Sequence, residues 1–258
     1  MNKKFVFTFV IFLLVACAPK TPPDLQSTIS VAIEQTRKAE EALVTQMPPT
    51  NTPAPTNTPQ PPNTPRPTST PRPTNTKTPI PQPIYLTGSG DTIIDFENTF
   101  QIAIVKINGN SASSHFAVIN YGKNGDKYDL LVNTTDPYEG ILPLDFHEDE
   151  HTTRFEVKAK GSWEITILPL SSARVLSVPG SVSGSGDDVI LLIGSAPDIA
   201  IISGNSESRH FAVISYGSSK DLLVNTTDPY NGTVVLDKDT LILTINSESN
   251  WNIEVKKK

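Results

Sequence analysis

His115-Phe-Ala-Val-Ile119 and Asp129-Leu-Leu-Val-Asn-Thr-Thr-Asp-Pro-Tyr138 decide the fold, because both stretches occur twice in the chain. They return as His210-Phe-Ala-Val-Ile214 and Asp221-Leu-Leu-Val-Asn-Thr-Thr-Asp-Pro-Tyr230. Repetition over this length is typical of a structural unit that is used twice in series. The globular part of the 258-residue chain is therefore predicted to consist of two copies of one unit.

Each copy is made of short runs of β-branched and aromatic residues separated by turn residues. In the second copy, Thr233-Val-Val-Leu236 and Thr240-Leu-Ile-Leu-Thr-Ile245 are such runs, and Gly204-Asn-Ser206 has turn chemistry. The last run of each copy begins at a tryptophan, Trp163 or Trp251. Neither copy contains a helical period. Short strands at this spacing indicate an all-β fold, either a β sandwich or a small barrel.

The repeat also predicts the domain boundaries. We expect a first β domain over 84–170, a linker over 171–180 and a second β domain over 181–258. A unit of this size can bury a core of its own, although one larger two-sheet domain built from both halves is the alternative. The copies resemble a tandem pair of β domains found in bacterial envelope proteins, which carry similar Gly-Ser-Gly-Asp and Leu-Leu-Val-Asn phrases. The resemblance implies no particular activity.

The first 16 residues have the pattern of an export signal. A lysine pair at 3 and 4 precedes an apolar run over 5–16, which is too short to span a bilayer comfortably. The run ends in Leu-Val-Ala-Cys17, which resembles the lipobox of bacterial lipoproteins. The resemblance implies cleavage before Cys17, acylation of its thiol and attachment to a membrane through the lipid. The protein is then expected in the bacterial cell envelope, outside the cytoplasm, at the cell surface or the outer membrane.

Two segments separate Cys17 from the repeats. Residues 17–46 carry a thin apolar stripe at Leu25, Ile29 and Ile33, which suits a short coiled coil, a membrane-surface helix or a marginal helical spacer. Residues 47–83 contain 14 prolines and 10 threonines among 37 residues. Because proline removes amide donors and fixes φ, this segment is predicted to be an extended, disordered stalk. Stalks of this composition after a lipobox resemble those of bacterial surface lipoproteins.

Charge and cysteine content exclude some partners and bonds. Residues 84–258 carry 23 acidic and 13 basic side chains, a formal net charge of −10. Nucleic acid requires a basic surface, so it is not expected as a partner. Cys17 is the only cysteine, which leaves no intrachain disulfide, so the two domains must depend on their hydrophobic cores.

No catalytic set is identified, so we expect the protein not to be an enzyme. His147-Glu-Asp-Glu-His151 matches the H-E-x-x-H zinc motif in letters, but in proteases that motif lies on a helix. Here it interrupts a predicted hairpin that the second copy closes with Asp237-Lys-Asp239, so a solvated loop is expected. His115 and His210 have no nucleophile motif nearby and are expected at strand edges, each with a local hydrogen bond.

The repeated Asn-Thr-Thr-Asp-Pro-Tyr loops contain two candidate ligand-binding residues, Asp136 and Asp228. One interpretation joins them with Asp91 and Asp187, at the ends of the Gly-Ser-Gly-Asp turns, as oxygen ligands of calcium. The other interpretation assigns these polar side chains to hydrogen bonds that hold the turn backbone. Calcium is the one cofactor that the sequence suggests, and both interpretations stay open.

Four aromatic residues are candidates for contact with a sugar. Tyr138 and Tyr230 follow the repeated loops and could present their rings to a ligand as platforms. Trp163 and Trp251 instead begin strands of alternating apolar residues, which favours a role as core anchors.

These features favour a non-catalytic binding or adhesion protein of the cell envelope. A carbohydrate or another envelope component is the expected partner. Two like domains on one tether would bind bivalently, because the first contact raises the effective concentration for the second. The alternative is a structural spacer or a docking module for another envelope protein.

Overall fold

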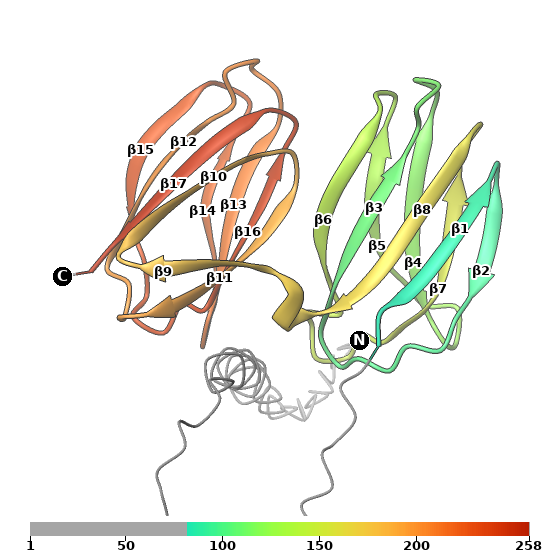
Figure 1. Cartoon of the computed structure of the whole chain (residues 1–258), viewed down its shortest axis with the longest axis horizontal. Helices are drawn as coiled ribbons and strands as arrows, with labels where there is room; N and C mark the ends of the chain where they lie inside the picture. Colours follow the sequence, from blue (N-terminus) through green and yellow to red (C-terminus); the bar gives the residue numbers. More distant parts are fainter. Residues whose placement is uncertain (1–81, 258) are drawn as a thin grey trace, which may run out of the picture.

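The computed structural model describes residues 82–257. The expected signal peptide, the lipidation site Cys17, the segment 17–46 and the stalk up to residue 81 lie outside the described residues. Within the described part of the chain, no helix is long and apolar enough to cross a membrane. The all-β prediction is confirmed, since strands and turns form two β sandwiches that lie next to each other (Figure 1).

The first repeat forms two four-stranded antiparallel sheets. One sheet has the order β1-β8-β3-β6 and the other the order β2-β7-β4-β5. The bounds of the strands are β1 (Ile84–Ser89), β2 (Thr92–Asp95), β3 (Ala103–Gly109), β4 (Phe116–Gly122), β5 (Lys127–Thr134), β6 (Tyr138–Leu144), β7 (Thr152–Lys158) and β8 (Ser162–Pro169).

The second repeat reproduces this topology strand for strand. Its sheets have the orders β10-β17-β12-β15 and β14-β13-β16-β11-β9. The bounds are β10 (Gly180–Ser185), β11 (Asp188–Gly194), β12 (Ile199–Gly204), β13 (Phe211–Tyr216), β14 (Lys220–Thr226), β15 (Tyr230–Val235), β16 (Ile242–Ser247) and β17 (Asn250–Lys256). Only β9 (Arg174–Val178) has no counterpart among the described strands of the first repeat.

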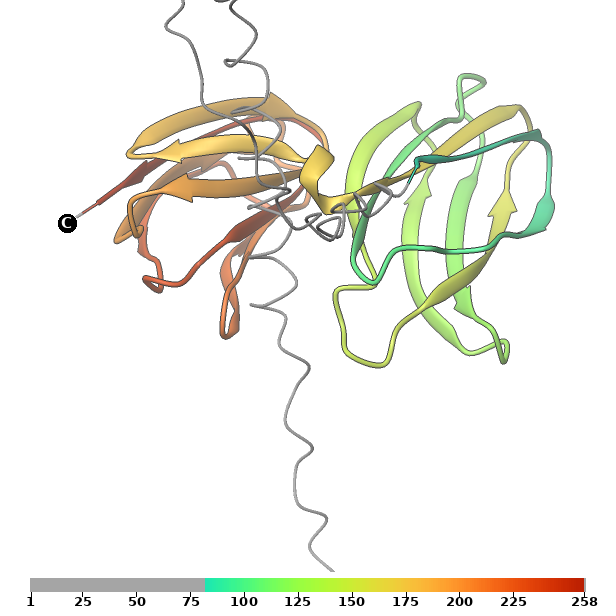
Figure 2. The ribbon, with the colours of Figure 1, turned by 60° about the horizontal axis from the view of Figure 1, so that its bottom comes forward.

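The expected linker over 171–180 is more ordered than a simple connection. A 3₁₀ turn, η1 (Leu170–Ser172), leads from the first sandwich to β9, which pairs in parallel with β11 (Figure 2). Leu176 and Val178 of β9 are buried in the core of the second repeat. The alternation of buried and exposed residues along Arg174–Val178 is that of a half-buried strand, so this segment belongs to the second sandwich.

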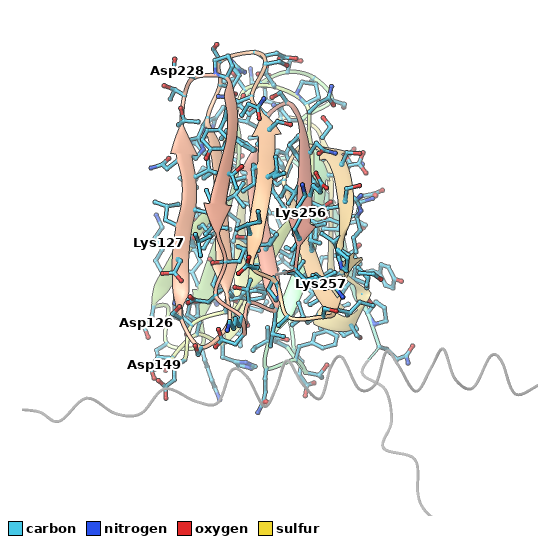
Figure 3. All side chains as sticks on the ribbon, turned by 90° about the vertical axis from the view of Figure 1, so that its left-hand side faces the viewer. Asp126, Lys127, Asp149, Asp228, Lys256 and Lys257 are labelled. Carbon is cyan, nitrogen blue, oxygen red and sulfur yellow. The ribbon has the colours of Figure 1, made fainter. Side chains whose placement is uncertain are left out.

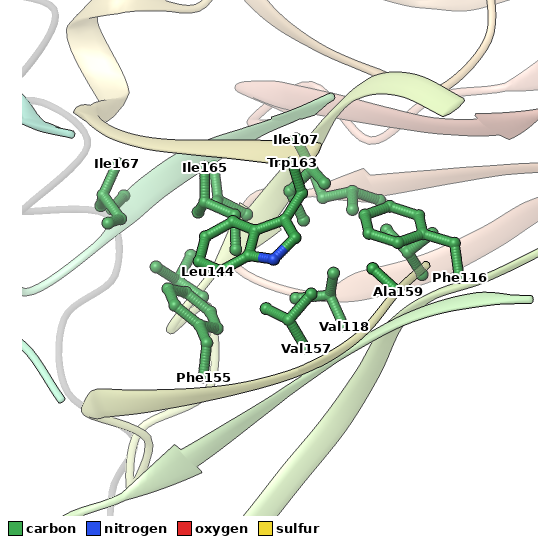
Figure 4. Close-up of a cluster of buried hydrophobic side chains, with 14 of the residues drawn as sticks. Ile107, Phe116, Val118, Leu144, Phe155, Val157, Ala159, Trp163, Ile165 and Ile167 are labelled. Atoms are coloured by element: carbon green, nitrogen blue, oxygen red, sulfur yellow. The ribbon is translucent and has the colours of Figure 1, made fainter. Parts of the chain in front are cut away.

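A tryptophan anchors the core of each sandwich. Trp163 is 1% exposed and packs among apolar side chains from both sheets, including Phe155, Val157 and Ile165 (Figure 4). Its indole N–H donates to the carbonyl of Gly90 at 3.1 Å. Trp251 makes the equivalent bond in the second repeat. The prediction that both tryptophans are core anchors is confirmed.

The Gly-Ser-Gly-Asp turns take the chain from one sheet to the other. Gly90 has a φ of 73° and Gly186 a φ of 76°, a left-handed conformation that favours glycine. The first glycine of the motif has a packing role, because a Cβ at Gly88 would overlap the indole ring of Trp163. The motif therefore lets the corner lie directly on the core tryptophan.

A third hydrophobic cluster joins the two sandwiches. It contains Ile104, Phe146 and Leu170 from the first repeat and its exit, and Val189, Leu191, Tyr216 and Ile242 from the second. The rings of Phe146 and Tyr216 meet edge to face, with centroids 5.3 Å apart. The second-repeat members lie on the outer face of the β14-β13-β16-β11-β9 sheet, the face that points away from its own core.

The same face of the first repeat carries charged side chains where the second repeat has apolar ones. Val189 corresponds to Ile93 and Ile242 to Arg154, since the strands of the two repeats pair in matching register. Arg154 forms an ion pair with Asp95 at 2.6 Å on this surface, whereas Ile242 is fully buried between the repeats. The two copies have thus diverged where one sheet face is covered and the other is open.

Candidate functional site

The candidate site is a cleft of about 660 Å³ where the two sandwiches meet. From the first repeat it is bordered by the turn before β6, by β6 and by part of β5, and from the second repeat by the Gly-Ser-Gly-Asp corner and the end of β16. Side chains with polar or charged groups dominate its lining, including Lys106, Asn133, Asp136, Glu139, Asp187, Glu207, Arg209, Asn246 and Glu248.

The floor of this cleft is held by a hydrogen bond between repeats. The hydroxyl of Tyr138 donates to Oδ2 of Asp187 at 2.6 Å. The backbone N–H of Ile141 donates to the carbonyl of Asp187 at 3.0 Å, so β6 is fixed against the corner by main chain as well. Gly140 permits this approach, because a Cβ there would lie 3.1 Å from the Cβ of Asp187 and would also crowd the Tyr138 hydroxyl.

Burial changes the titration of both partners. It raises the pKa of the Tyr138 phenol, and the neighbouring Asp187 carboxylate adds to the increase. Burial also raises the pKa of Asp187, while the hydrogen bonds from Tyr138 and from the Ser247 backbone oppose that increase. Both groups therefore hold their protons more firmly than the free side chains do.

Ion pairs lie along the cleft, and one of them joins the two repeats. Nη2 of Arg209 lies 2.7 Å from Oδ2 of Asp136 in the first repeat and 2.7 Å from Oε2 of Glu248 in its own repeat. Lys106 forms a second pair with Glu139 at 2.8 Å. These side chains are partly exposed, so their charges stay accessible to a polar ligand.

The structure brings together two of the four aspartates that were joined as a calcium site, but from different repeats. Asp136 and Asp187 both line the cleft, whereas Asp91 and Asp228 do not. Among residues 82–257, no group of three or more histidine, cysteine, aspartate or glutamate side chains is arranged to hold a metal ion.

The backbone-holding interpretation describes what these aspartates contact. Oδ1 of Asp91 accepts the N–H of Ala159 at 2.9 Å, and Oδ1 of Asp187 accepts the N–H of Ser247 at 2.8 Å. The backbones of Asp136 and Asp228 are held in their turns by Asn110 and Asn205, which donate to the two carbonyls at 2.7 Å and 3.0 Å. The repeated motif is therefore first of all a turn signal.

The two candidate tyrosines have different surroundings. Each ring lies tilted against a core phenylalanine, Phe116 for Tyr138 and Phe211 for Tyr230. The Tyr138 hydroxyl is bound by the second repeat. Within the described part of the chain, the Tyr230 hydroxyl has no partner, because β15 lies at the far end of the second sandwich. The two tyrosines are therefore not equivalent in their hydroxyl contacts.

The histidine-containing segments lie where the sequence predicted them. His147-Glu-Asp-Glu-His151 forms an exposed turn between β6 and β7, closed by the N–H of Glu150 donating to the carbonyl of His147. His115 and His210 lie just before β4 and β13, and their Nε2 atoms contact Asn133 and Asn225, each at 3.3 Å.

The contact between repeats also encloses a second recess of about 420 Å³ near Tyr128, Tyr216 and Lys220. Here Nζ of Lys220 lies 3.4 Å from Nε2 of His147 and also stands over the Tyr216 ring. The histidine motif thus contributes to the junction of the two sandwiches.

Arg209 and the apolar contact residues were not identified from the sequence. A signal was available in the differences between the copies. Arg209 stands where the first copy has Ser114, and Phe146 stands where the second copy has Lys238. Positions that change in charge or polarity between two otherwise similar repeats can mark the surfaces on which they meet.

Comparisons with known proteins give no family. No family model and no curated protein matches the sequence. Solved structures that match include one described as "The Triple Jelly Roll Fold and Turret Assembly in an Archaeal Virus", at 13% identity over 65% of this chain and 52% of that chain, with a TM-score of 0.26. YhaK from Escherichia coli matches at 10% identity over 68% of this chain and 84% of its own, with a TM-score of 0.23. HutD from Pseudomonas fluorescens SBW25 matches at 9% identity over 68% and 78%, with a TM-score of 0.21. This chain spans about half the length of the viral protein, and likenesses this distant carry no argument about function.

Proposed function

We propose that this chain is a non-catalytic, lipid-anchored binding protein of the bacterial cell envelope. Acylated Cys17 would hold it to the membrane, and the Pro/Thr-rich stalk would hold the two sandwiches away from the lipid. The ligand would be a carbohydrate or another polar envelope component, bound in the cleft between the repeats.

The observation that carries this proposal is the composite lining of the cleft. Carboxylates, amides and one guanidinium converge there from both repeats in a recess large enough for a small saccharide unit. Such groups are donors and acceptors for hydroxyls, and the partly exposed pairs of Arg209 can exchange one partner for a ligand.

A single composite site replaces two equal loop-tip sites in this proposal. Equal sites would need Tyr138 and Tyr230 in like surroundings, but the second repeat engages the hydroxyl of Tyr138. Avidity would then come from several anchored copies on one membrane.

The non-catalytic part of the proposal is supported by what the acidic groups already contact. Asp187 accepts hydrogen bonds from Tyr138 and Ser247, and Asp136 pairs with Arg209. Carboxylates with these partners hold the backbone and the neighbouring repeat in position.

The alternative, a docking module for another envelope protein, has one favourable observation. Leu222 on β14 and Val235 on β15 are 59% and 76% exposed at the free end of the second sandwich. Exposed apolar side chains gathered at one end of a domain can mark a surface for protein contact.

The test is binding of the fragment Ile84–Lys258 to an array of bacterial glycans, with calcium and again with chelator. We expect saturable binding that Asn133→Ala weakens by about five- to tenfold, the loss of roughly one hydrogen bond. Asn225→Ala is the matched control, because Asn225 makes the same histidine contact outside the cleft. Loss of binding with chelator would add calcium to the site.

A blank array, or equal losses with Asn133→Ala and Asn225→Ala, would contradict the cleft as a glycan site. Capture of one envelope protein by the fragment, in the absence of glycan binding, would then support the docking alternative.

A further inference from the structure

The two repeats meet through different surfaces of the sandwich. Because the sandwich is duplicated, each repeat also has the surface that the other repeat uses in this contact, and that second surface is not used within the chain's described part. The first repeat uses its β5–β6 end together with Ile104 of the neighbouring strand β3, and the second repeat uses the outer face of its β14-β13-β16-β11-β9 sheet. Their counterparts are the β14–β15 end of the second repeat and the outer face of the β2-β7-β4-β5 sheet of the first repeat, where Leu222, Val235 and Ile93 are left exposed by the rest of residues 82–257.

The free end of the second repeat has retained several groups used in the internal contact, among them Asp228, which is labelled on the second sandwich in Figure 3. Tyr230 corresponds to Tyr138, Gly232 to Gly140 and Asp228 to Asp136. Gly232 again leaves room for the tyrosine hydroxyl, since a Cβ there would lie 2.6 Å from it. Leu222 and Val235 correspond to Leu130 and Pro143, which face the second repeat in the recesses between the sandwiches.

The free face of the first repeat has retained counterparts of the second-repeat residues that contact the first repeat internally. Asp91 corresponds to Asp187, and like it binds a backbone N–H through Oδ1, while its other oxygen has no partner in the part of the chain that is described. Ile93 corresponds to Val189. Val189 is fully buried by the first repeat, whereas Ile93 is 66% exposed.

At one pair of positions where the two free surfaces differ from the internal contact, the two charges are complementary. The internal contact places Asp136 against Arg209 and Glu248. On the free surfaces, Asp228 would meet the position of Glu248, which in the first repeat is Lys160. Both side chains are exposed, and neither has a charged partner among residues 82–257.

A second pair of positions also differs between the internal contact and the free surfaces. Phe146 packs on Tyr216 in the internal contact, and its counterpart in the second repeat is Lys238. The counterpart of Tyr216 is Tyr121, whose hydroxyl donates to Glu156 at 2.6 Å. The aromatic pair of the internal contact is thus replaced by Lys238 and Tyr121, and the Tyr121 hydroxyl holds Glu156, whose other oxygen lies 3.4 Å from Nζ of Lys158, beside this position.

We propose that copies of this chain associate head to tail, with the β14–β15 end of one copy docking on the β2-β7-β4-β5 face of the next. Tyr230 would donate to Asp91 of the neighbouring copy, Asp228 would pair with its Lys160, and Lys238 with its Glu156. Because the two docking surfaces differ, a pair of copies still has one unused β14–β15 end and one unused β2-β7-β4-β5 face. Further copies can therefore add to form a row.

The association should be weaker than the internal contact and sensitive to salt. The apolar cluster of Phe146, Leu170 and Ile242 is replaced by charged groups, and surface ion pairs are screened by salt. Copies held on one membrane would have a raised effective concentration, which favours a weak contact.

The experiment is sedimentation equilibrium of the fragment Ile84–Lys258, which contains both cores and all the described strands. We expect concentration-dependent growth in mass up to about 1 mM at low ionic strength, and its loss at about 0.5 M salt. Asp228→Lys alone and Lys160→Asp alone should each weaken association by about tenfold or more, because each places like charges together.

A mixture of the two variants should restore association, since each then offers the charge that the other lacks. Lys123→Asp and Asp126→Lys are matched controls with the same charge changes in the exposed β4–β5 turn, and they should behave as the wild type. A monomer at all concentrations, equal effects of target and control reversals, or a mixture that stays monomeric would each overturn the proposal.

Discussion

The hydroxyl of Tyr138 donates a hydrogen bond to the carboxylate of Asp187 at 2.6 Å, across the junction of two repeats that otherwise have the same topology. Tyr230 occupies the equivalent position in the second repeat, and no residue between 82 and 257 accepts a hydrogen bond from its hydroxyl. One duplicated tyrosine therefore joins the repeats while the other lies at a free end.

Tyr138→Phe should destabilise the protein, and Tyr230→Phe should not. The first change leaves a half-buried carboxylate oxygen without its donor, which costs about 1–3 kcal/mol in the free energy of unfolding. The second change removes a hydroxyl that has no partner in the described chain, so its effect should stay within about 0.5 kcal/mol. Urea unfolding of both variants measures the difference, and equal effects would contradict the role assigned to Tyr138.

Gly88→Ala should be destabilising because of the core tryptophan. A Cβ at this position would overlap the indole of Trp163, so the ring or the strand must move, at a cost of about 1–3 kcal/mol. Gly161→Ala is the matched control, since nothing lies within 4 Å of a Cβ there. Thermal unfolding should show a lowered Tm for the first variant only, and an unchanged Tm for Gly88→Ala would contradict the close packing of this corner.

Ile242→Arg should uncouple the two sandwiches without unfolding either one. Ile242 is buried between the repeats, while arginine is accommodated at the equivalent position of the first repeat, Arg154. Each repeat has one tryptophan, so a Trp251→Phe background reports on the first sandwich and a Trp163→Phe background on the second.

In denaturant, the two reporters should give coincident transitions for the parent proteins and separate transitions once Ile242→Arg is added. Arg154→Ile, the reverse change on the open face, should leave the transitions coincident. Coincident transitions for Ile242→Arg would indicate that the third cluster contributes little to the coupling.

Much of the fold could be predicted because it depends on local sequence patterns that occur in both repeats. Alternating apolar runs predicted the strands, and the tryptophan at the start of each last run predicted the core anchors Trp163 and Trp251, which are buried. The insertion in the hairpin at His147 to His151 predicted an exposed turn, because the second repeat closes the same hairpin without it.

The junction could not be predicted in the same way, since it depends on contacts between segments that are distant in sequence. Parallel pairing of β9 with β11 gives a buried face to a stretch that was expected to be a linker. Likewise, Asp136 and Asp187 line one cleft between the repeats, although each motif by itself indicates only a turn. The differences at Ile242 and Phe146 between the copies carried the information that the shared motifs did not.

The half-buried Asp187 carboxylate at the junction should make stability depend on pH in a defined direction. The pKa of Asp187 is raised above 3.8 in the folded protein, chiefly by burial, so the folded state binds this proton more tightly than the unfolded state. Stability from this group is therefore greatest at or below about pH 3.8 and falls as the pH rises through the folded pKa.

Asp187→Asn removes this titration and keeps an acceptor for the Ser247 N–H, so it isolates the effect. The free energy of unfolding of the variant minus that of the wild type should increase as the pH rises through this range and then become constant. Asp145, whose pKa is also raised by burial, is present in both proteins and cancels in the difference. A difference that is independent of pH, measured by urea unfolding in steps of pH, would show that Asp187 is not the group whose burial penalises the folded state.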